Sequence, residues 1–375
     1  MTEPEKSNAQ EYEEPVVLTE QEQEDLNDAE KLPAAVVYSG QDFDAEGLVR
    51  RLSRNDILIP TFGHDDDRIV SAGFQRAFVW TRSQMDRFIE TLLLGYPIPG
   101  IFLVKQQDRR YLVLDGQQRL RTLQHFYEGV HDGKEFALRN VGERFKGLTY
   151  KTLPEEQRRQ IDNSYFQATI VDTDGSEESL EAIYQIFERL NSGGTQLTPH
   201  EIRVALYAGP FIDFLERLNR TESWRNLYGR PSPRIRDQEL ILRIVAFLGD
   251  AGSYSRPLKS FLNRFIADHR ELEGIDTEEI QRLFTTAADL IVEGPGRAAL
   301  RPRGYQVNTA LTEALFVGLM TRLRHSSPPS PSSLTEAVAA VDEDPQVIDA
   351  TTGSTADEEK VRTRLARAIE LLGEG

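Results

Sequence analysis

The sequence of 375 residues contains no cysteine. Disulfide bonds, thiol nucleophiles and cysteine-ligated zinc are therefore excluded for this chain. Long apolar runs are also absent, because the longest apolar region, residues 88–101, is interrupted by Glu90, Gly95, Pro97 and Pro99. A membrane-spanning helix needs about 20 consecutive apolar residues, and the acidic N-terminus has no apolar core typical of a signal peptide. We therefore expect a cytoplasmic protein with no membrane partner.

Positive charge is scarce relative to negative charge. The chain has 44 Lys and Arg residues against 61 Asp and Glu residues, a formal net charge of −17. Eleven acidic residues and one lysine fall within residues 1–30, which leaves a net charge of about −7 for the remainder. A protein that clamps DNA without sequence preference needs clustered Lys and Arg to neutralise phosphates. A DNA clamp without sequence preference is therefore not expected. The charge balance is nevertheless compatible with a local basic pocket for a nucleotide.

Hydropathy patterns divide the chain into three parts. Residues 1–38 form an acidic tail with few apolar residues, which we predict to be disordered. Residues 39–175 mix helix and strand patterns, whereas residues 176–375 show helical patterns with a Pro/Ser-rich linker at 326–333. The sequence therefore predicts an α+β fold, a small mixed-sheet domain followed by a mostly helical domain. The strands are expected at 56–62, 101–106, 109–115 and 165–172, and the first helices at 42–54, 81–95, 116–129 and 176–191.

The segment YLVLDGQQRLRTL carries the strongest local chemistry. An apolar strand runs directly into a helix through Asp115 and Gly116. The unpaired N–H groups of a helix N-terminus favour anions, glycine permits close approach, and the Arg119 guanidinium is suited to grip a phosphate. Asp115 is suited to cap the helix, to orient Arg119 or to hold a metal. The residues alone leave two interpretations open: an anion-binding helix start, or a capped helix with an exposed pair, Gln117 and Gln118.

Two further segments contain polar residues in apolar surroundings. In FQRAFVW, Gln75 and Arg76 lie between aromatic residues, which is typical either of a fixed recognition element or of an edge strand whose arginine reaches solvent. In FERLNSGGTQLTPHEIRVALY, Thr198 and Glu201 form a predicted capping box, with Pro199 at the first helical position. Helix initiation alone explains these three residues, so they do not indicate a bound ligand. The remaining candidate polar contacts are Asn191, His200 and Arg203.

Known nuclease and nucleotide motifs are otherwise missing. The sequence has no Walker A loop, no H-E-x-x-H and no paired-histidine nuclease pattern among its six histidines. The HDDD stretch at residues 64–67 is interpreted as a solvated turn. A metal site formed by this stretch and the DGQQR region, which would make the chain itself a nuclease, is the least favoured alternative.

Five segments in this order resemble the GmrSD-type restriction family over about residues 40–370: FQRAFVW, ETLLLGYPIPGIFL, VLDGQQRLRTLQHFYEG, FERLNSGGTQLTPHEIR and RDQELILR. The resemblance implies a ParB/sulfiredoxin-like fold for the first domain. It also implies an NTP-binding, often NTP-hydrolysing, module with Mg²⁺ that serves in defence against modified phage DNA. The implied catalytic residues are Asp115, Gln118 and Arg119, with Asp115 also as the metal ligand. The implied nucleotide-binding residues are Gln75, Arg76, Gly116, Gln117, Arg119, Asn191 and Arg203.

Two departures from the family pattern affect this expectation. The insertion GHDDDRIVSAG separates Phe62 from the FQR segment, and the chain shows no C-terminal HNH motif. We therefore expect no DNA cleavage in cis and a separate nuclease subunit as partner. The alternative is a non-catalytic subunit that senses DNA or docks a protein, with arginines of RPSPRIR (230–236) and RPRG (301–304) on DNA phosphates. Oligomerisation is compatible with either reading.

Overall fold

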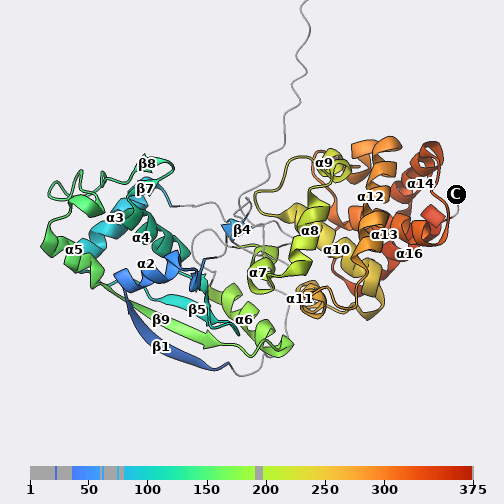
Figure 1. Cartoon of the computed structure of the whole chain (residues 1–375). Helices are drawn as coiled ribbons and strands as arrows, with labels where there is room; N and C mark the ends of the chain where they lie inside the picture. The colour runs from blue at the N-terminus through green and yellow to red at the C-terminus, as the bar shows by residue number, and fades with distance from the viewer. Residues whose placement is uncertain are drawn as a thin grey trace, which may run out of the picture. The chain divides into compact units, whose positions relative to one another are not determined.

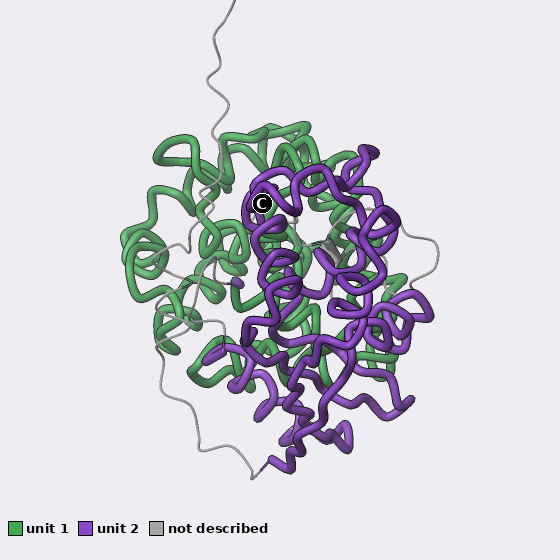
Figure 2. Tube along the Cα trace, turned by 90° about the vertical axis from the view of Figure 1, so that its left-hand side faces the viewer, with its two compact units in different colours: residues 1–30, 68–72, 198–375 green, residues 31–67, 73–197 purple. Residues whose placement is uncertain are grey.

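The computed structural model describes residue 22 and residues 36–59, 61–62, 74–75, 80–190 and 197–373. The chain forms two compact units, coloured separately in Figure 2. Residues 31–67 and 73–197 make the first, here called the α/β unit, and residues 1–30, 68–72 and 198–375 make the second, the helical unit. The predicted α+β class is confirmed. Most of the predicted disordered tail and the HDDD stretch lie outside the described residues.

A five-stranded mixed sheet forms the centre of the α/β unit, in the order β1-β9-β5-β6-β2. The strands predicted at 101–106 and 109–115 are confirmed as β5 and β6, which pair antiparallel as a hairpin. Strand β9 runs parallel to β5 and antiparallel to β1, and β2 runs parallel to β6. The strands are β1 (Tyr38–Asp44), β2 (Ile57–Leu58), β5 (Ile101–Lys105), β6 (Tyr111–Asp115) and β9 (Tyr165–Asp172), with two small ladders of β3 (Thr61–Phe62) with β4 (Phe74–Gln75) and β7 (Val130–His131) with β8 (Lys134–Glu135).

Helices cover the sheet because their apolar stripes match its inward-facing residues. Figure 1 shows α2, α3 and α4 on one side of strands β1, β9 and β5. Leu103 and Val113 of the sheet join Ile89 of α3 and Leu120 and Phe126 of α4 in one core, all with no exposed surface. The helices of this unit are α2 (Ala45–Ser53), α3 (Arg82–Leu93), α4 (Gln117–Glu128), α5 (Glu155–Asp162) and α6 (Glu177–Leu190). Helix α6 packs against β6, so this unit extends beyond residue 175 to Leu197.

The helical unit is organised around α13, which packs against α10, α12 and α16. The α13–α16 contact is close at Gly318, where a Cβ atom would lie 2.9 Å from the carbonyl oxygen of Ala368. The helices are α7 (Pro199–Leu206), α8 (Pro210–Asn219), α9 (Glu222–Tyr228), α10 (Arg236–Asp250), α11 (Leu258–His269), α12 (Thr277–Glu293), α13 (Thr309–His325), α14 (Pro331–Glu343), α15 (Pro345–Ala350) and α16 (Glu358–Gly373), with short 3₁₀ turns η2 (Ala251–Ser253) and η3 (Gly296–Leu300). No helix in the described ranges is long and apolar enough to cross a membrane.

Local signals set where several helices begin. The predicted capping box at α7 is confirmed, with Thr198 and Glu201 bonded reciprocally and Pro199 in the first turn. Thr81, the first residue of the helix predicted at 81–95, forms a capping box with Gln84 at the start of α3. The predicted Pro/Ser linker overlaps a helix start, because Ser330 caps α14 and Pro331 lies in its first turn.

Candidate functional site

A left-handed glycine builds the junction between β6 and α4. Strand β6 ends at Asp115, Gly116 is the N-cap residue of α4 with φ of 97°, and the helix begins at Gln117. A Cβ atom at position 116 would lie only 2.5 Å from Cγ2 of Ile101. Glycine alone combines this backbone angle with this close approach. The chain therefore turns from sheet to helix within one residue.

The first turn of α4 has no side-chain cap, because Gly116 supplies none. The Leu120 N–H donates to the Gly116 carbonyl at 3.0 Å, so the N–H groups of Gln117, Gln118 and Arg119 precede the intrahelical ladder. Such N–H groups and the helix dipole together favour an anion at this end.

Arg119 is held at this junction by two acceptors. Its Nη2 donates to Oδ2 of Asp115 at 2.7 Å and its Nη1 donates to the Pro99 carbonyl at 2.7 Å. A guanidinium has five N–H groups, so about three are without a partner among the described residues. The Arg119 side chain is 11% exposed and that of Asp115 is 49% exposed. Of the roles considered for Asp115, this geometry corresponds to orienting Arg119.

The two glutamines of the box are not a solvent-exposed pair, so that interpretation is wrong. Gln117 is buried, and its Nε2 lies 3.5 Å from the Val113 carbonyl. Gln118 is partly buried, and its Oε1 accepts a hydrogen bond from the Trp80 N–H at 3.3 Å. The sequence signal was misleading because two adjacent amides at a helix start appear solvated until their tertiary neighbours are known.

Sequence reasoning missed a cluster further along α4. The rings of His125 and His131 lie 5.0 Å apart. Burial lowers the pKa of His125 to about 4, with His131 and Arg121 as further causes, and burial also lowers the pKa of Arg121. Arg121 is a second guanidinium on α4, two residues after Arg119. The only signal in the sequence was the spacing of Arg121 and His125, four residues apart on one helix face.

Three predicted nucleotide-binding side chains fall outside the described residues. Gln75 pairs with Thr61 through the backbone of β4, but the structure describes no side chain there. Arg76 and Asn191 are not described at all. Their predicted roles remain predictions.

Arg203 lies in the helical unit within a buried polar network. It has no exposed surface, and it donates through Nε to Oδ1 of Asn263 at 2.9 Å and through Nη1 to Oε1 of Glu239 at 3.0 Å. These bonds tie α7 to α10 and α11, which is a sufficient structural reason for an arginine at this position.

The arginine clusters suggested for DNA contact also make internal bonds. Arg234 is buried and forms a bidentate pair with Glu201, through Nε and Nη2 at 2.9 Å each. Arg236 pairs with Glu22 at 2.8 Å. Arg301 donates through Nη1 to the Leu227 carbonyl at 2.7 Å. Much of the positive charge in these two clusters therefore stabilises the helical unit.

His200 is buried and neutral, which predicts a pH dependence of stability. Its Nε2 lies 3.1 Å from Oε1 of Gln238, and Nδ1 has no hydrogen-bond partner within the described ranges. Because the Gln238 amide N donates to Glu216, its Oε1 accepts here, so Nε2 of His200 carries the proton. Burial, with a contribution from Arg203, lowers the pKa of His200 to about 3.

We expect the free energy of unfolding of the helical unit to decrease as the pH falls below about 6.5. In this range the histidine of the unfolded chain becomes protonated, whereas His200 of the folded chain stays neutral. The loss continues down to the folded pKa of about 3 and amounts to about 2 kcal/mol at pH 5. Urea unfolding of the Trp80→Phe protein with and without His200→Gln, followed by the fluorescence of the remaining Trp224 at pH 7.5 and pH 5, measures this loss. The variant should lose about 2 kcal/mol less than wild type over this range. Identical losses would show that His200 is not the titrating group.

No group of three or more His, Asp or Glu side chains within the described ranges is arranged to hold a metal ion. Asp115 is a single, half-exposed carboxylate. A Mg²⁺ ion that arrives with nucleotide phosphates takes only one or two carboxylates, so Asp115 fits that minimal requirement.

A mixed sheet, a tight strand-to-helix turn and an arginine over an uncapped helix start define a domain suited to bind phosphate. Residues 58–208 match the family model described as the GmrSD restriction endonuclease, N-terminal domain, a stretch that runs from the end of β2 to the residues just after α7. This match supports the resemblance to the GmrSD-type restriction family over that stretch, which is less than half of the 375-residue chain. No curated protein and no solved structure matches the chain.

Proposed function

We propose that the α/β unit binds the phosphates of a nucleoside triphosphate at the β6–α4 junction, as part of a restriction system that acts on modified DNA. The observation that carries this proposal is the first turn of α4, which begins at Gly116 without a side-chain cap and lies beside the Arg119 guanidinium. Backbone N–H groups and a fixed guanidinium are complementary to a polyphosphate.

Each residue of the box has a role in this proposal. Arg119 is anchored by the Pro99 carbonyl and directs its remaining N–H groups to the phosphates. Asp115 orients Arg119, and it is the carboxylate that would hold Mg²⁺, which when bound neutralises phosphate charge. For hydrolysis, the amide of Gln118 would position the attacking water, and Arg119 would stabilise the charge that develops on the transferred phosphoryl group.

The test is calorimetric titration of the protein with ATP and GTP, with and without Mg²⁺. Arg119→Ala should weaken binding tenfold or more, because a charge-assisted hydrogen bond contributes about 1.5–3 kcal/mol. Arg110→Ala is the matched control, since Arg110 is exposed in the β5–β6 turn, where it pairs with Asp108. Equal affinities for wild type and Arg119→Ala, or no binding by either, would refute the proposal.

A further inference from the structure

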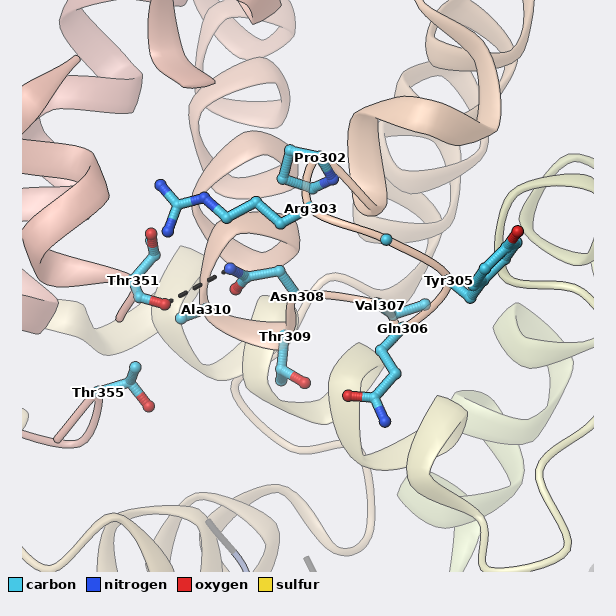
Figure 3. A pocket seen from close by; sticks show the side chains of 11 residues that line it. Pro302, Arg303, Tyr305, Gln306, Val307, Asn308, Thr309, Ala310, Thr351 and Thr355 are labelled. Atoms are coloured by element: carbon cyan, nitrogen blue, oxygen red, sulfur yellow. Dashed lines mark hydrogen bonds between the residues drawn. The ribbon is translucent and has the colours of Figure 1, made fainter. Parts of the chain in front are cut away.

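A hollow lies in the helical unit, along the loop between η3 and α13 (Figure 3). Its volume is about 580 Å³, within the range of ligand pockets. The lining comes from residues 302–310 and from Thr351 and Thr355, which lie between α15 and α16. All of these residues belong to one compact unit.

The loop that forms the hollow is held in place by hydrogen bonds to backbone carbonyl groups. Arg301 donates through Nε to the Tyr305 carbonyl at 3.1 Å and through Nη1 to the Leu227 carbonyl at 2.7 Å. The Asn308 N–H donates to the Leu300 carbonyl at 2.9 Å, and its Nδ2 lies 3.4 Å from the Thr351 carbonyl. These contacts shape the hollow before any ligand arrives, which reduces the entropy lost on binding.

The lining differs in charge from the rest of the protein. None of the lining residues is acidic, although the chain carries a net charge of −17. Arg303 is exposed and makes one hydrogen bond, from Nη1 to Oγ1 of Thr352 at 3.1 Å. Its other N–H groups have no partner in the described part of the chain. A ligand attracted here is therefore neutral or anionic.

Tyr305 places an exposed aromatic ring at the end of the hollow opposite Arg303 (Figure 3). Tyr305 is 77% exposed, the highest value among the large apolar and aromatic side chains that the structure describes. Figure 3 shows the Arg303 guanidinium and the Tyr305 ring at opposite ends of the hollow, with Asn308 and Thr309 between them. A cation, neutral hydrogen-bonding groups and an open ring thus follow one another along one hollow.

We propose that this hollow is a second nucleotide site, which takes a nucleoside phosphate. The base stacks on Tyr305, as bases stack on exposed aromatic side chains in single-strand binding proteins. The phosphate lies against Arg303 and the N–H groups of Thr309 and Ala310 in the first turn of α13. The sugar lies between them, over Asn308. The ligand is either a free mononucleotide or one unpaired nucleotide of a DNA strand.

The experiment separates base from phosphate by using AMP, adenosine and inorganic phosphate as calorimetric probes. All proteins carry Arg119→Ala, which weakens the proposed site in the α/β unit, so the two proposals can fail independently. Tyr305→Ala should weaken AMP and adenosine about tenfold or more and leave phosphate unchanged. Arg303→Ala should weaken AMP and phosphate and leave adenosine unchanged. Both side chains are exposed, so neither change should impair folding.

Matched controls are Tyr165→Ala on β9 and Arg282→Ala on α12, which remove an exposed tyrosine and an exposed arginine that do not line the hollow. An AMP affinity in Tyr305→Ala and Arg303→Ala equal to that of the controls would overturn the proposal, as would absence of AMP binding at millimolar concentration. A single-stranded oligodeoxyadenylate then identifies the source of the ligand. Tyr305-dependent binding tighter than that of AMP indicates a DNA strand, and weaker binding indicates a free nucleotide.

Discussion

Glu313→Ala should unfold the helical unit at urea concentrations that leave the wild-type unit folded. The Glu313 carboxylate has no exposed surface and lies between two buried arginines. Its Oε2 accepts from Nε of Arg243 at 2.7 Å, and its Oε1 accepts from Nε of Arg364 at 2.7 Å. One side chain thus joins α10, α13 and α16. Its loss would leave two buried guanidinium groups without their counter-charge.

The expected loss is about 3–5 kcal/mol, the cost of removing one member of a buried ion pair. The control is Glu279→Ala, which breaks a pair with Arg324 whose side chains are 32% and 34% exposed, and it should cost less than about 1 kcal/mol. Urea unfolding in a Trp80→Phe background measures both, because the remaining tryptophan, Trp224, is buried in the helical unit. Its ring contacts Phe316, one turn from Glu313 on α13.

A triple replacement tests whether the charges themselves stabilise the fold. Arg243→Met, Glu313→Leu and Arg364→Met together should cost little or even stabilise the unit, because apolar side chains of similar size avoid the desolvation of three charges. If Glu313→Ala cost no more than Glu279→Ala, the triad would be solvated in solution and its burial would not explain stability.

The sequence predicted the elements whose signals are local. The β5–β6 hairpin and the junction at Gly116 were predictable because apolar runs, a turn and a helix period follow one another within about 30 residues. The capping box of Thr198 and Glu201 was predictable because both partners lie within one helical turn.

Strand β1 was not predicted, and the physical reason is its exposure. Of its seven residues only Phe43 is buried, so neither an apolar run nor an alternating pattern marks it. It forms because its backbone pairs with β9 along its whole length, from Tyr38 opposite Val171 to Asp44 opposite Tyr165. Pairing between segments more than 100 residues apart leaves no local signal.

The candidate site was predictable by residue type but not by geometry. The sequence placed Asp115, Gly116 and Arg119 at a helix start, and the structure adds the Pro99 carbonyl as the second acceptor for Arg119. That contact depends on how the PIPG turn meets α4, which residue spacing does not encode. Likewise, RPRG was only a basic motif in sequence, whereas in the structure Arg301 braces the loop and Arg303 lines a hollow.

Gly116→Ala should abolish nucleotide binding at the β6–α4 junction and destabilise the α/β unit. Two independent costs add at this position. A φ of 97° disfavours any residue with a Cβ by about 1–2 kcal/mol. The new methyl would also lie 2.5 Å from Cγ2 of Ile101, a core residue with no exposed surface, and such overpacking costs about 1–3 kcal/mol.

Gly129→Ala is the matched control at the other end of the same helix. Gly129 is also left-handed, with φ of 76°, but a Cβ there would meet nothing within 4 Å. The stability of Gly129→Ala should therefore fall only by the cost of a Cβ atom in a left-handed backbone conformation, about 1–2 kcal/mol. Its nucleotide affinity should be retained. Urea-dependent hydrogen exchange of peptides from α4 measures the stability of this unit, and calorimetry with ATP measures binding. Equal losses in both variants would mean that Ile101 moves aside at no cost, and retained binding in Gly116→Ala would mean that the phosphates do not lie at this helix start.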